Sequence, residues 1–371
     1  MENPNKGTYT PKPKNAMKNN IVYTITFHSV LNHGAVLQAY ALQEYLRKLN
    51  YQPVIANYTP PYFMAQVLRP AKGIGKTALK YKRLYLFKKF SEQHLVKSTR
   101  YISRKKLTQL PIAHAAICGS DQIWNKLLTN GAPDKAYYLS FIKEGTKKIA
   151  YGASAGGHTL ESSEHGALDL LKDFDAIGVR ENHLCENLKN QHTLKNVQMV
   201  SDPSLLISDY NNIMDHSKTP KSKYIVSYEV SSDATRAEYS KYLKKAQELT
   251  KLPVYHIGDK FLEAADHNIL AISPSQWLSL ISSSEYVVTN SFHGAMFSMN
   301  FKKKFSFIKH LEEEKNARTM SLLKKVRLEE KAATTTDQLS EIFKDYHTGE
   351  LQKFIKESQN FLISALENNE K

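Results

Sequence analysis

Short apolar strands that alternate with helices are the feature that most constrains the fold of this 371-residue chain. Several strand-like segments are apolar at nearly every position, which is typical of parallel strands buried on both faces. The clearest helix, at residues 35–49, repeats its apolar residues at helical spacing, and a second helix start is marked by Ser273 with Pro274 after it. Strands are predicted at 21–27, 53–58, 112–118, 147–154, 174–180, 196–202, 223–230, 253–258 and 285–290. The pattern therefore predicts an α/β fold.

A polar stretch, DYNNIMDHSKTPKSK, interrupts this alternation, which then restarts. Because the chain is also too long for one ordinary core, we predict two doubly wound, Rossmann-like domains that face a cleft at the carboxyl ends of their strands. The predicted parts are a disordered tail at 1–19, an N-terminal domain at 20–208 with a basic insertion at 60–110, a linker at 209–222, a C-terminal domain at 223–334, and helices at 335–371 that pack back on the N-terminal domain.

The positive charge of the chain, formally +15, is concentrated in the insertion. Between Arg69 and Lys106 there are thirteen Lys or Arg residues and one acid, Glu92, with aromatic residues interleaved. Such a segment is either a solvated basic helix or a patch that binds anionic lipid head groups. Nucleic acid is not expected as a partner, because no recognition motif accompanies the charge.

The remaining composition predicts a cytoplasmic protein without a cofactor. Cys118 and Cys185 are too few for a disulfide framework, and no metal-ligand spacing is present. The sequence shows neither a secretory signal nor an apolar run long enough to span a bilayer. A peripheral position on the inner face of the plasma membrane is compatible with the basic insertion.

Loops that follow the predicted strands hold the candidate functional residues of the N-terminal half. Asn32 and Gly34 lie where the first strand gives way to a helix, which favours either an ordinary N-cap or an anion-binding helix start. Asp121, in the stretch GSDQIWN with Gln122, offers a carboxylate that can orient or deprotonate a hydroxyl. Asp is also a common helix cap, so the signal is weak alone.

Two further candidates in this half are a serine in a tight turn and an arginine at the end of a strand. Ser154 lies in the small-residue stretch YGASAGG, and Arg180 directly follows an apolar strand. A guanidinium there needs an anion, either a bound ligand or a structural ion pair with Glu181 or another acid.

In the C-terminal half, the stretch VVTNSFHGAMFSMNF places Asn290, Ser291, His293 and Gly294 at a strand-to-helix junction. The backbone N–H groups at the start of a helix favour an anion. An imidazole titrates near neutral pH and can donate a proton. A capped helix with an incidental histidine is the simpler interpretation.

These motifs, taken in order, resemble the polysaccharide pyruvyl transferase family. The matching stretches are NHGAVLQAYALQ, GSDQIWN, YGASAG, VRE, SDPSLL, TNSFHGAMFSMNF and NARTMSLL, and they extend from about residue 21 to 323. The resemblance implies a two-domain GT-B fold and a transfer of pyruvate from phosphoenolpyruvate to a sugar. It also implies that Arg180 and His293 contact the donor. Where the family often has NYG, this chain has NHG at residues 32–34.

The reaction gives each candidate a role. Phosphoenolpyruvate carries two anions and needs a proton on its methylene carbon, so His293 is predicted to be the acid and Asp121 to serve the acceptor hydroxyl. Donor binding is assigned to Arg180, Ser291, Gly294, Asn290 and Ser154; Asn32, Gly34 and Gln122 are assigned to the acceptor or to the lining of the cleft. The acceptor is predicted to be a sugar of a polysaccharide or of its lipid-linked precursor, and no metal is required.

Two other functions fit parts of the sequence. A GT-B glycosyltransferase would use a nucleotide sugar, and an acidic residue that binds a ribose in the second domain would favour it. A non-catalytic basic scaffold on a membrane would need neither Arg180 nor His293, and the presence of both argues against it.

Overall fold

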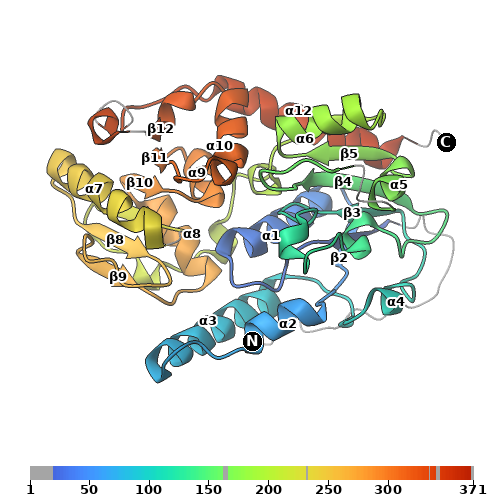
Figure 1. The fold of residues 1–371 in the computed structure, drawn as a ribbon, viewed down its shortest axis with the longest axis horizontal. Helices are drawn as coiled ribbons and strands as arrows, with labels where there is room; N and C mark the ends of the chain where they lie inside the picture. The colour runs from blue at the N-terminus through green and yellow to red at the C-terminus, as the bar shows by residue number, and fades with distance from the viewer. Residues whose placement is uncertain (1–19, 162–165, 231–232, 334, 340–342, 369–371) are drawn as a thin grey trace. The chain divides into compact units, whose positions relative to one another are not determined.

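The computed structural model of the protein describes residues 20–161, 166–230, 233–333, 335–339 and 343–368 (Figure 1). The tail predicted at 1–19 lies outside the described residues. The chain divides into two compact units. Unit 1 comprises Met1–Arg69, Lys88–Ile207 and Phe354–Lys371; unit 2 comprises Pro70–Phe87 and Ser208–Lys353.

Unit 1 is built on a six-stranded sheet in which all neighbouring strands are parallel. Its strands are β1 (Ile21–Ile25), β2 (Gln52–Ile55), β3 (Ala115–Cys118), β4 (Lys147–Ala153), β5 (Ala176–Val179) and β6 (Val197–Met199). The spatial order β2-β1-β3-β4-β5-β6 reverses direction at β1, as in a doubly wound fold. Each strand lies within a predicted segment or overlaps it by all but one residue, so these strand predictions are confirmed.

Helices connect these strands and cover the sheet. They are α1 (His33–Lys48), α2 (Pro61–Leu68), α4 (Arg104–Leu107), α5 (Ala167–Lys172) and α6 (Asn182–Glu186), with short helical turns at Lys126–Leu128, Lys135–Tyr138, Asn187–Gln191 and Pro203–Leu205. The helix α3 (Ile74–His94) belongs to unit 2 up to Phe87 and to unit 1 beyond it. The last helix, α12 (Gly349–Glu367), contributes its part from Phe354 onward to unit 1.

Contacts with the sheet fix α12 in unit 1. The backbone N–H of Ser201 donates to Ser358 Oγ at 2.8 Å, and the rings of Tyr151 and Phe361 lie 6.4 Å apart. The C-terminal helix therefore covers β4 and the end of β6, although the segment Ser208–Lys353 of unit 2 separates it from them in the sequence.

Unit 2 has its own six-stranded parallel sheet, in the order β12-β11-β10-β7-β8-β9. Its strands are β7 (Ile225–Tyr228), β8 (Val254–Ile257), β9 (His267–Ile269), β10 (Tyr286–Thr289), β11 (Lys304–Ile308) and β12 (Ala332–Ala333). The predictions for β7, β8 and β10 are confirmed. The strands β9, β11 and β12 were not predicted: β9 and β12 have three and two residues, and lysine and serine interrupt the apolar pattern of β11.

As in unit 1, helices connect the strands of unit 2. They are α7 (Asp233–Thr250), α8 (Pro274–Ser283), α9 (Phe292–Asn300) and α10 (Glu313–Lys325), with short turns at Asn211–Ile213, His216–Lys218, Glu329–Lys331 and Thr336–Gln338. The predicted start of α8 is confirmed: Ser273 and Gln276 form a reciprocal capping box, with Pro274 at the first helical position. Trp277 of α8 is fully buried and its ring packs edge-on against Phe297 of α9, which fixes α9 in the unit.

Among the described residues, no helix is long and apolar enough to cross a membrane.

Candidate functional site

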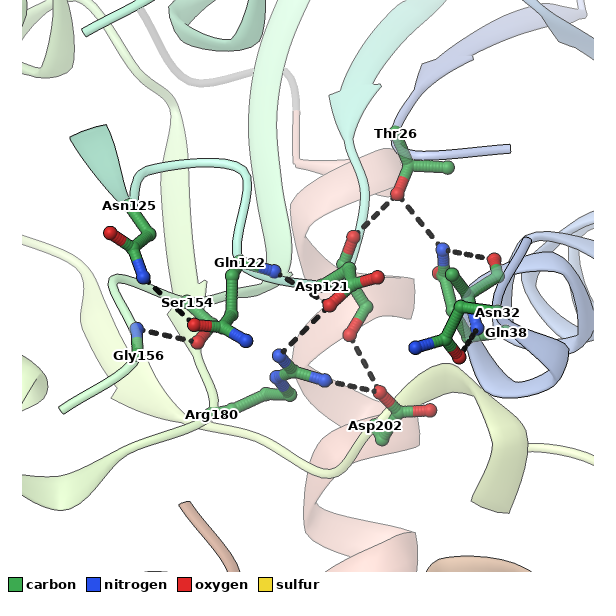
Figure 2. A network of polar contacts seen from close by, with 12 residues as sticks. Thr26, Asn32, Gln38, Asp121, Gln122, Asn125, Ser154, Gly156, Arg180 and Asp202 are labelled. Atoms are coloured by element: carbon green, nitrogen blue, oxygen red, sulfur yellow. Dashed lines mark hydrogen bonds and ion pairs between the residues drawn. The ribbon is translucent and has the colours of Figure 1, made fainter. Parts of the chain in front are cut away.

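The candidate residues of unit 1 meet in a buried polar network at the carboxyl ends of its strands (Figure 2). Parallel strands end at the same edge of a sheet, so the loops after β3, β4, β5 and β6 bring together residues that are far apart in the sequence. Asp121, Ser154, Arg180 and Asp202 come from these four loops and are each at most 7% exposed. Asp202 was not among the candidates of the sequence analysis.

Arg180 lies between two carboxylates. Its Nη1 is 3.0 Å from Asp202 Oδ2 and its Nη2 is 3.8 Å from Asp121 Oδ1, as Figure 2 shows. The same Asp202 oxygen accepts a hydrogen bond from Ser120 Oγ at 2.7 Å. A buried guanidinium needs such partners, because an unpaired charge is strongly disfavoured away from water. Two acids other than the adjacent residue, Asp202 and Asp121, thus form ion pairs with Arg180, in line with the structural ion pair that the sequence left open.

Asp121 is held in a strained conformation beside this cation. Its φ is 83°, in the left-handed region that non-glycine residues rarely adopt. Its Oδ1 accepts a hydrogen bond from the backbone N–H of Gln122 at 2.8 Å. Strain of this kind persists only where the surroundings enforce it, and it is common at functional sites. The result is a carboxylate at the end of β3 with a fixed direction and a cation beside it.

Ser154 and Gln122 are already engaged within the protein. Ser154 Oγ donates to Glu181 Oε1 at 2.5 Å and accepts from the backbone N–H of Gly156 at 3.0 Å. Gln122 Oε1 accepts from Asn125 Nδ2 at 2.9 Å. Gly156 has a φ of 77°, and a Cβ there would lie 2.6 Å from Gln122 Oε1, so the loop after β4 needs this glycine to approach Gln122. These contacts order the loops around Asp121.

The start of α1 is joined to the same network. Asn32 caps α1, its Oδ1 accepting from the N–H of Ala35 at 3.1 Å, and Gly34 is buried in the first turn. Gln38 of α1 donates to Thr26 Oγ1 at 2.9 Å, and Thr26 Oγ1 donates to the carbonyl of Ser120. Asn32 thus has the role of an ordinary N-cap, one of the two interpretations that the sequence left open.

The candidate residues of unit 2 form the junction between β10 and α9. Ser291 is the N-cap of α9, and its Oγ accepts from the N–H of Gly294 at 3.3 Å. Asn290 Oδ1 accepts from the N–H of Val230 at 2.7 Å, which ties this loop to the one after β7. A Cβ on Gly294 would lie 2.9 Å from Thr289 Cβ, so α9 can begin this close to the strand only with glycine at that position. These contacts therefore fix the first turn of α9 close to the end of β10.

His293 is the second residue of α9 and is 4% exposed. Its ring lies 5.3 Å from that of Phe292, edge to face. The imidazole therefore lies in the first turn of α9.

Two cationic or titratable residues near this junction were missed by the sequence analysis. His310 Nε2 lies 2.9 Å from the carbonyl oxygen of Asn290 and so donates to it, and burial lowers the pKa of His310. The guanidinium carbon of Arg318 lies 5.6 Å from the centre of the Phe292 ring, the first residue of α9. Arg318 belongs to the stretch NARTMSLL, which the family resemblance had already singled out. The start of α9 thus has a guanidinium, that of Arg318, beside it.

A cavity in unit 1 lies at the end of the sheet opposite to the candidate residues of that unit. It has a volume of about 760 Å³ and is bordered by Asp175 and Asn196 at the amino ends of β5 and β6, and by Phe361 of α12. The opposite, carboxyl ends of the strands carry the candidate residues. Within the described part of the chain, no group of three or more His, Cys, Asp or Glu is arranged to hold a metal ion.

Comparison with family models decides the relationship that the motifs suggested. The model for polysaccharide pyruvyl transferase matches residues 32–311, about three quarters of the chain. The chain belongs to the polysaccharide pyruvyl transferase family. Membership in this family implies a transferase that acts in polysaccharide modification. Among proteins of curated function, no sequence matches the chain.

Solved structures confirm the fold class of this family member. The S. aureus MnaA–UDP co-structure is similar with a TM-score of 0.51 and 11% identity, over 92% of this chain and 91% of that one. A UDP-GlcNAc 2-epimerase from Neisseria meningitidis, bound to UDP-GlcNAc, has a TM-score of 0.49 and 9% identity, over 92% and 93% of the two chains. At such identities the first likeness shows the fold alone. The predicted GT-B-like α/β class, with two six-stranded parallel sheets, is confirmed.

Proposed function

We propose that this protein transfers pyruvate from phosphoenolpyruvate to a sugar of a surface polysaccharide precursor, forming a pyruvyl ketal. Family membership supports the class of reaction. The acceptor we propose is lipid-linked, and because phosphoenolpyruvate is made inside cells, we place the reaction in the cytoplasm at the inner face of the plasma membrane. The observation that carries the proposal is the β10–α9 junction, where His293, the start of a helix and Arg318 come together.

The chemistry defines what the protein must supply. The methylene carbon of phosphoenolpyruvate gains a proton, and the central carbon becomes electron-poor. Two sugar hydroxyls form bonds to that carbon while its bond to the phosphate oxygen breaks. One hydroxyl proton is balanced by the proton on the new methyl group, and the other leaves with phosphate. The protein therefore needs donors for two anions, an acid, and a group that accepts hydroxyl protons.

The β10–α9 junction meets the needs of the donor. The N–H groups at the start of α9 suit a phosphate or carboxylate, and Ser291, Gly294 and Asn290 shape that start. A guanidinium such as that of Arg318 binds a carboxylate or phosphate with two parallel hydrogen bonds. We propose that His293, in the first turn of α9, donates a proton to the methylene carbon of the bound donor.

Asp121 meets the need for a proton acceptor. The Asp121 carboxylate lies 3.8 Å from the Arg180 guanidinium, and the strained backbone gives it one direction. We propose that it takes a proton from an acceptor hydroxyl, with Gln122, Asn32 and Gly34 in the surrounding loops. Arg180 has two proposed roles. It contacts the donor, as the family resemblance implies, or it acts through Asp121 by holding that carboxylate in place. We propose that Ser154 contributes to donor binding indirectly, because its hydrogen bond to Glu181 orders the loop after β4.

A binding experiment distinguishes this proposal from a nucleotide-sugar transferase, an alternative that the UDP in the structurally similar MnaA complex makes worth testing. We expect phosphoenolpyruvate to raise the unfolding temperature and UDP-GlcNAc to leave it unchanged, since a ligand at a hundred times its Kd adds about 2.7 kcal/mol to the unfolding free energy. Stabilisation by UDP-GlcNAc alone would contradict the proposal.

Variants assign the binding to residues. Arg318→Gln should raise the Kd for phosphoenolpyruvate at least tenfold, about 1.4 kcal/mol, because it loses a charged contact. Lys324→Gln, which removes one exposed cation from the same helix, is the matched control and should bind as the unmodified protein does. Arg180→Lys separates the two roles of Arg180. A higher Kd for phosphoenolpyruvate indicates that Arg180 contacts the donor, whereas an unchanged Kd with reduced turnover indicates that Arg180 positions Asp121.

A further inference from the structure

The helix α3 has an unusual outward face. Phe87 and Phe90 are 5% and 2% exposed and form its buried side. On the opposite side, Ile74, Tyr81 and Tyr85 are 92%, 46% and 64% exposed. An ordinary surface helix is polar on its outward side, and single exposed apolar residues need no explanation. Here the exposed apolar and aromatic residues are not single.

Their spacing places them in one line. Residues 74, 78, 81 and 85 are separated by four, three and four positions, so Ile74, Ala78, Tyr81 and Tyr85 form one stripe along the helix. At about 1.5 Å per residue, the stripe is about 17 Å long. We call it the α3 stripe. Both long sides of α3 are therefore apolar in part, one against the protein and one towards solvent.

Exposed lysines flank the α3 stripe. Lys82, Lys88 and Lys89 are exposed and project from the same half of the helix surface. The only acid between Arg69 and Lys106 is Glu92, whose carboxylate lies 3.7 Å from Lys88 Nζ, with both side chains more than half exposed. Arg83 is not part of this surface, because its side chain is only 14% exposed and pairs with Asp259. The outward face thus combines an apolar and aromatic centre with basic flanks.

We propose that the α3 stripe and its flanking lysines dock the protein on an anionic lipid bilayer. Tyrosine is favoured at the level of the lipid head groups, isoleucine at the acyl boundary, and lysine next to anionic head groups. A helix that lies in the plane of the interface needs this arrangement and no membrane-spanning length. A second copy of the chain is a poor occupant, because two such faces would place like charges against each other. Nucleic acid would use the lysines but gains nothing from Ile74.

The docking rests on the surface of α3 alone. Only its purpose, which is to bring the enzyme to a lipid-linked acceptor, rests on the proposed function. Vesicle binding measured without phosphoenolpyruvate therefore tests the docking separately from the reaction.

The experiment compares full-length proteins in a flotation assay. The vesicles contain phosphatidylcholine with phosphatidylglycerol, or phosphatidylcholine alone. We expect binding to the anionic vesicles only, weakened by salt because the lysines act at the surface. Ile74→Ser/Tyr81→Ser/Tyr85→Ser should weaken it at least tenfold with the charge unchanged, and Lys82→Glu/Lys88→Glu/Lys89→Glu should do the same.

A matched variant controls for net charge. Lys244→Glu/Lys324→Glu/Lys356→Glu changes three exposed lysines of other helices, α7, α10 and α12, by the same total charge. It should bind the vesicles as the unmodified protein does. In addition, the fluorescence of Tyr85→Trp should shift to shorter wavelength on anionic vesicles, because the new indole leaves water.

Three results would overturn the proposal. Full vesicle binding by the serine variant would show that the stripe is a solvated face. Equal losses in the control variant would show that only net charge matters. Tight binding of duplex DNA that depends on Lys82, Lys88 and Lys89, without vesicle binding, would assign the surface to nucleic acid. Thermal unfolding of each variant checks that a loss of binding is not a loss of the fold.

Discussion

At the scale of single residues, Asp121 places a carboxylate on a strained backbone at the end of β3. A φ of 83° costs a non-glycine residue on the order of 1–3 kcal/mol, and the chain places a carboxylate there all the same. A purely structural turn would be more stable with glycine. The conformation is maintained by the loops around it, including the hydrogen bond from the N–H of Gln122.

Substitution of Asp121 separates chemistry from stability. Asp121→Asn keeps the shape and tolerates the backbone conformation, but its amide cannot accept a hydroxyl proton. We expect turnover to fall at least a hundredfold and the free energy of unfolding to stay within about 1 kcal/mol. Asp121→Gly should be equally inactive and no less stable. Phosphate release and urea denaturation measure the two effects, and an active Asn variant would exclude Asp121 as the base.

At the scale of elements, periodicity predicted the strands that carry the candidate residues. The buried strands β1, β3, β5, β7 and β10 are short and almost wholly apolar, so the sequence marks them clearly. The strands β9 and β12 were missed because they lie at the edges of the second sheet, where fewer positions need to be apolar. The strand β11 begins with a lysine and contains a buried serine, Ser306, which hides its pattern.

The candidate site was predictable in its positions and less so in its contacts. Motifs at strand ends located Asp121, Arg180 and His293. The pairing of Arg180 with Asp202 was not predictable, because it depends on β6 lying beside β5, which periodicity does not specify. His310 was missed because it follows β11, a strand that was itself missed. Arg318 lies in the stretch NARTMSLL, which the family resemblance included, but no helix had been predicted there that would place its side chain.

A buried histidine in β8, His256, makes the free energy of unfolding depend on pH. His256 is fully buried, its Nδ1 is 3.0 Å from Ser227 Oγ, and burial lowers its pKa from 6.5 to about 4. Because the unfolded chain binds the proton more tightly, the contribution of His256 to stability is complete above about pH 6.5 and is lost as the pH falls towards 4. The loss amounts to about 3 kcal/mol.

Urea denaturation at a series of pH values tests this expectation. His256→Asn, whose amide can replace the Nδ1 contact with Ser227, does not titrate, so its free energy of unfolding should fall less steeply between pH 6.5 and 4. Identical slopes for the two proteins would show that the acid sensitivity arises from other groups.

At the scale of the whole molecule, the two units carry different kinds of charge. The network of unit 1 contains one buried cation, Arg180, and three buried carboxylates, Asp121, Glu181 and Asp202. The junction of unit 2 gathers His293, His310 and Arg318 instead. We therefore propose that the anionic donor binds at unit 2 and that the acceptor hydroxyl binds at unit 1. The proposed membrane docking by α3 would be a third function, separate from both sites.

A turnover measurement decides whether phosphoenolpyruvate is the donor and His293 the acid, as we propose. The protein is incubated with phosphoenolpyruvate and a panel of lipid-linked sugars, phosphate release is followed, and the glycan is examined for a pyruvyl ketal. We predict phosphate release that requires an acceptor and yields the ketal. His293→Ala and His293→Gln should remain folded and bind phosphoenolpyruvate, with turnover reduced at least a hundredfold, because an amide donates a hydrogen bond but no proton near pH 7. A Gln variant with nearly full turnover, or a glycan modified from a nucleotide sugar without phosphoenolpyruvate, would contradict this claim.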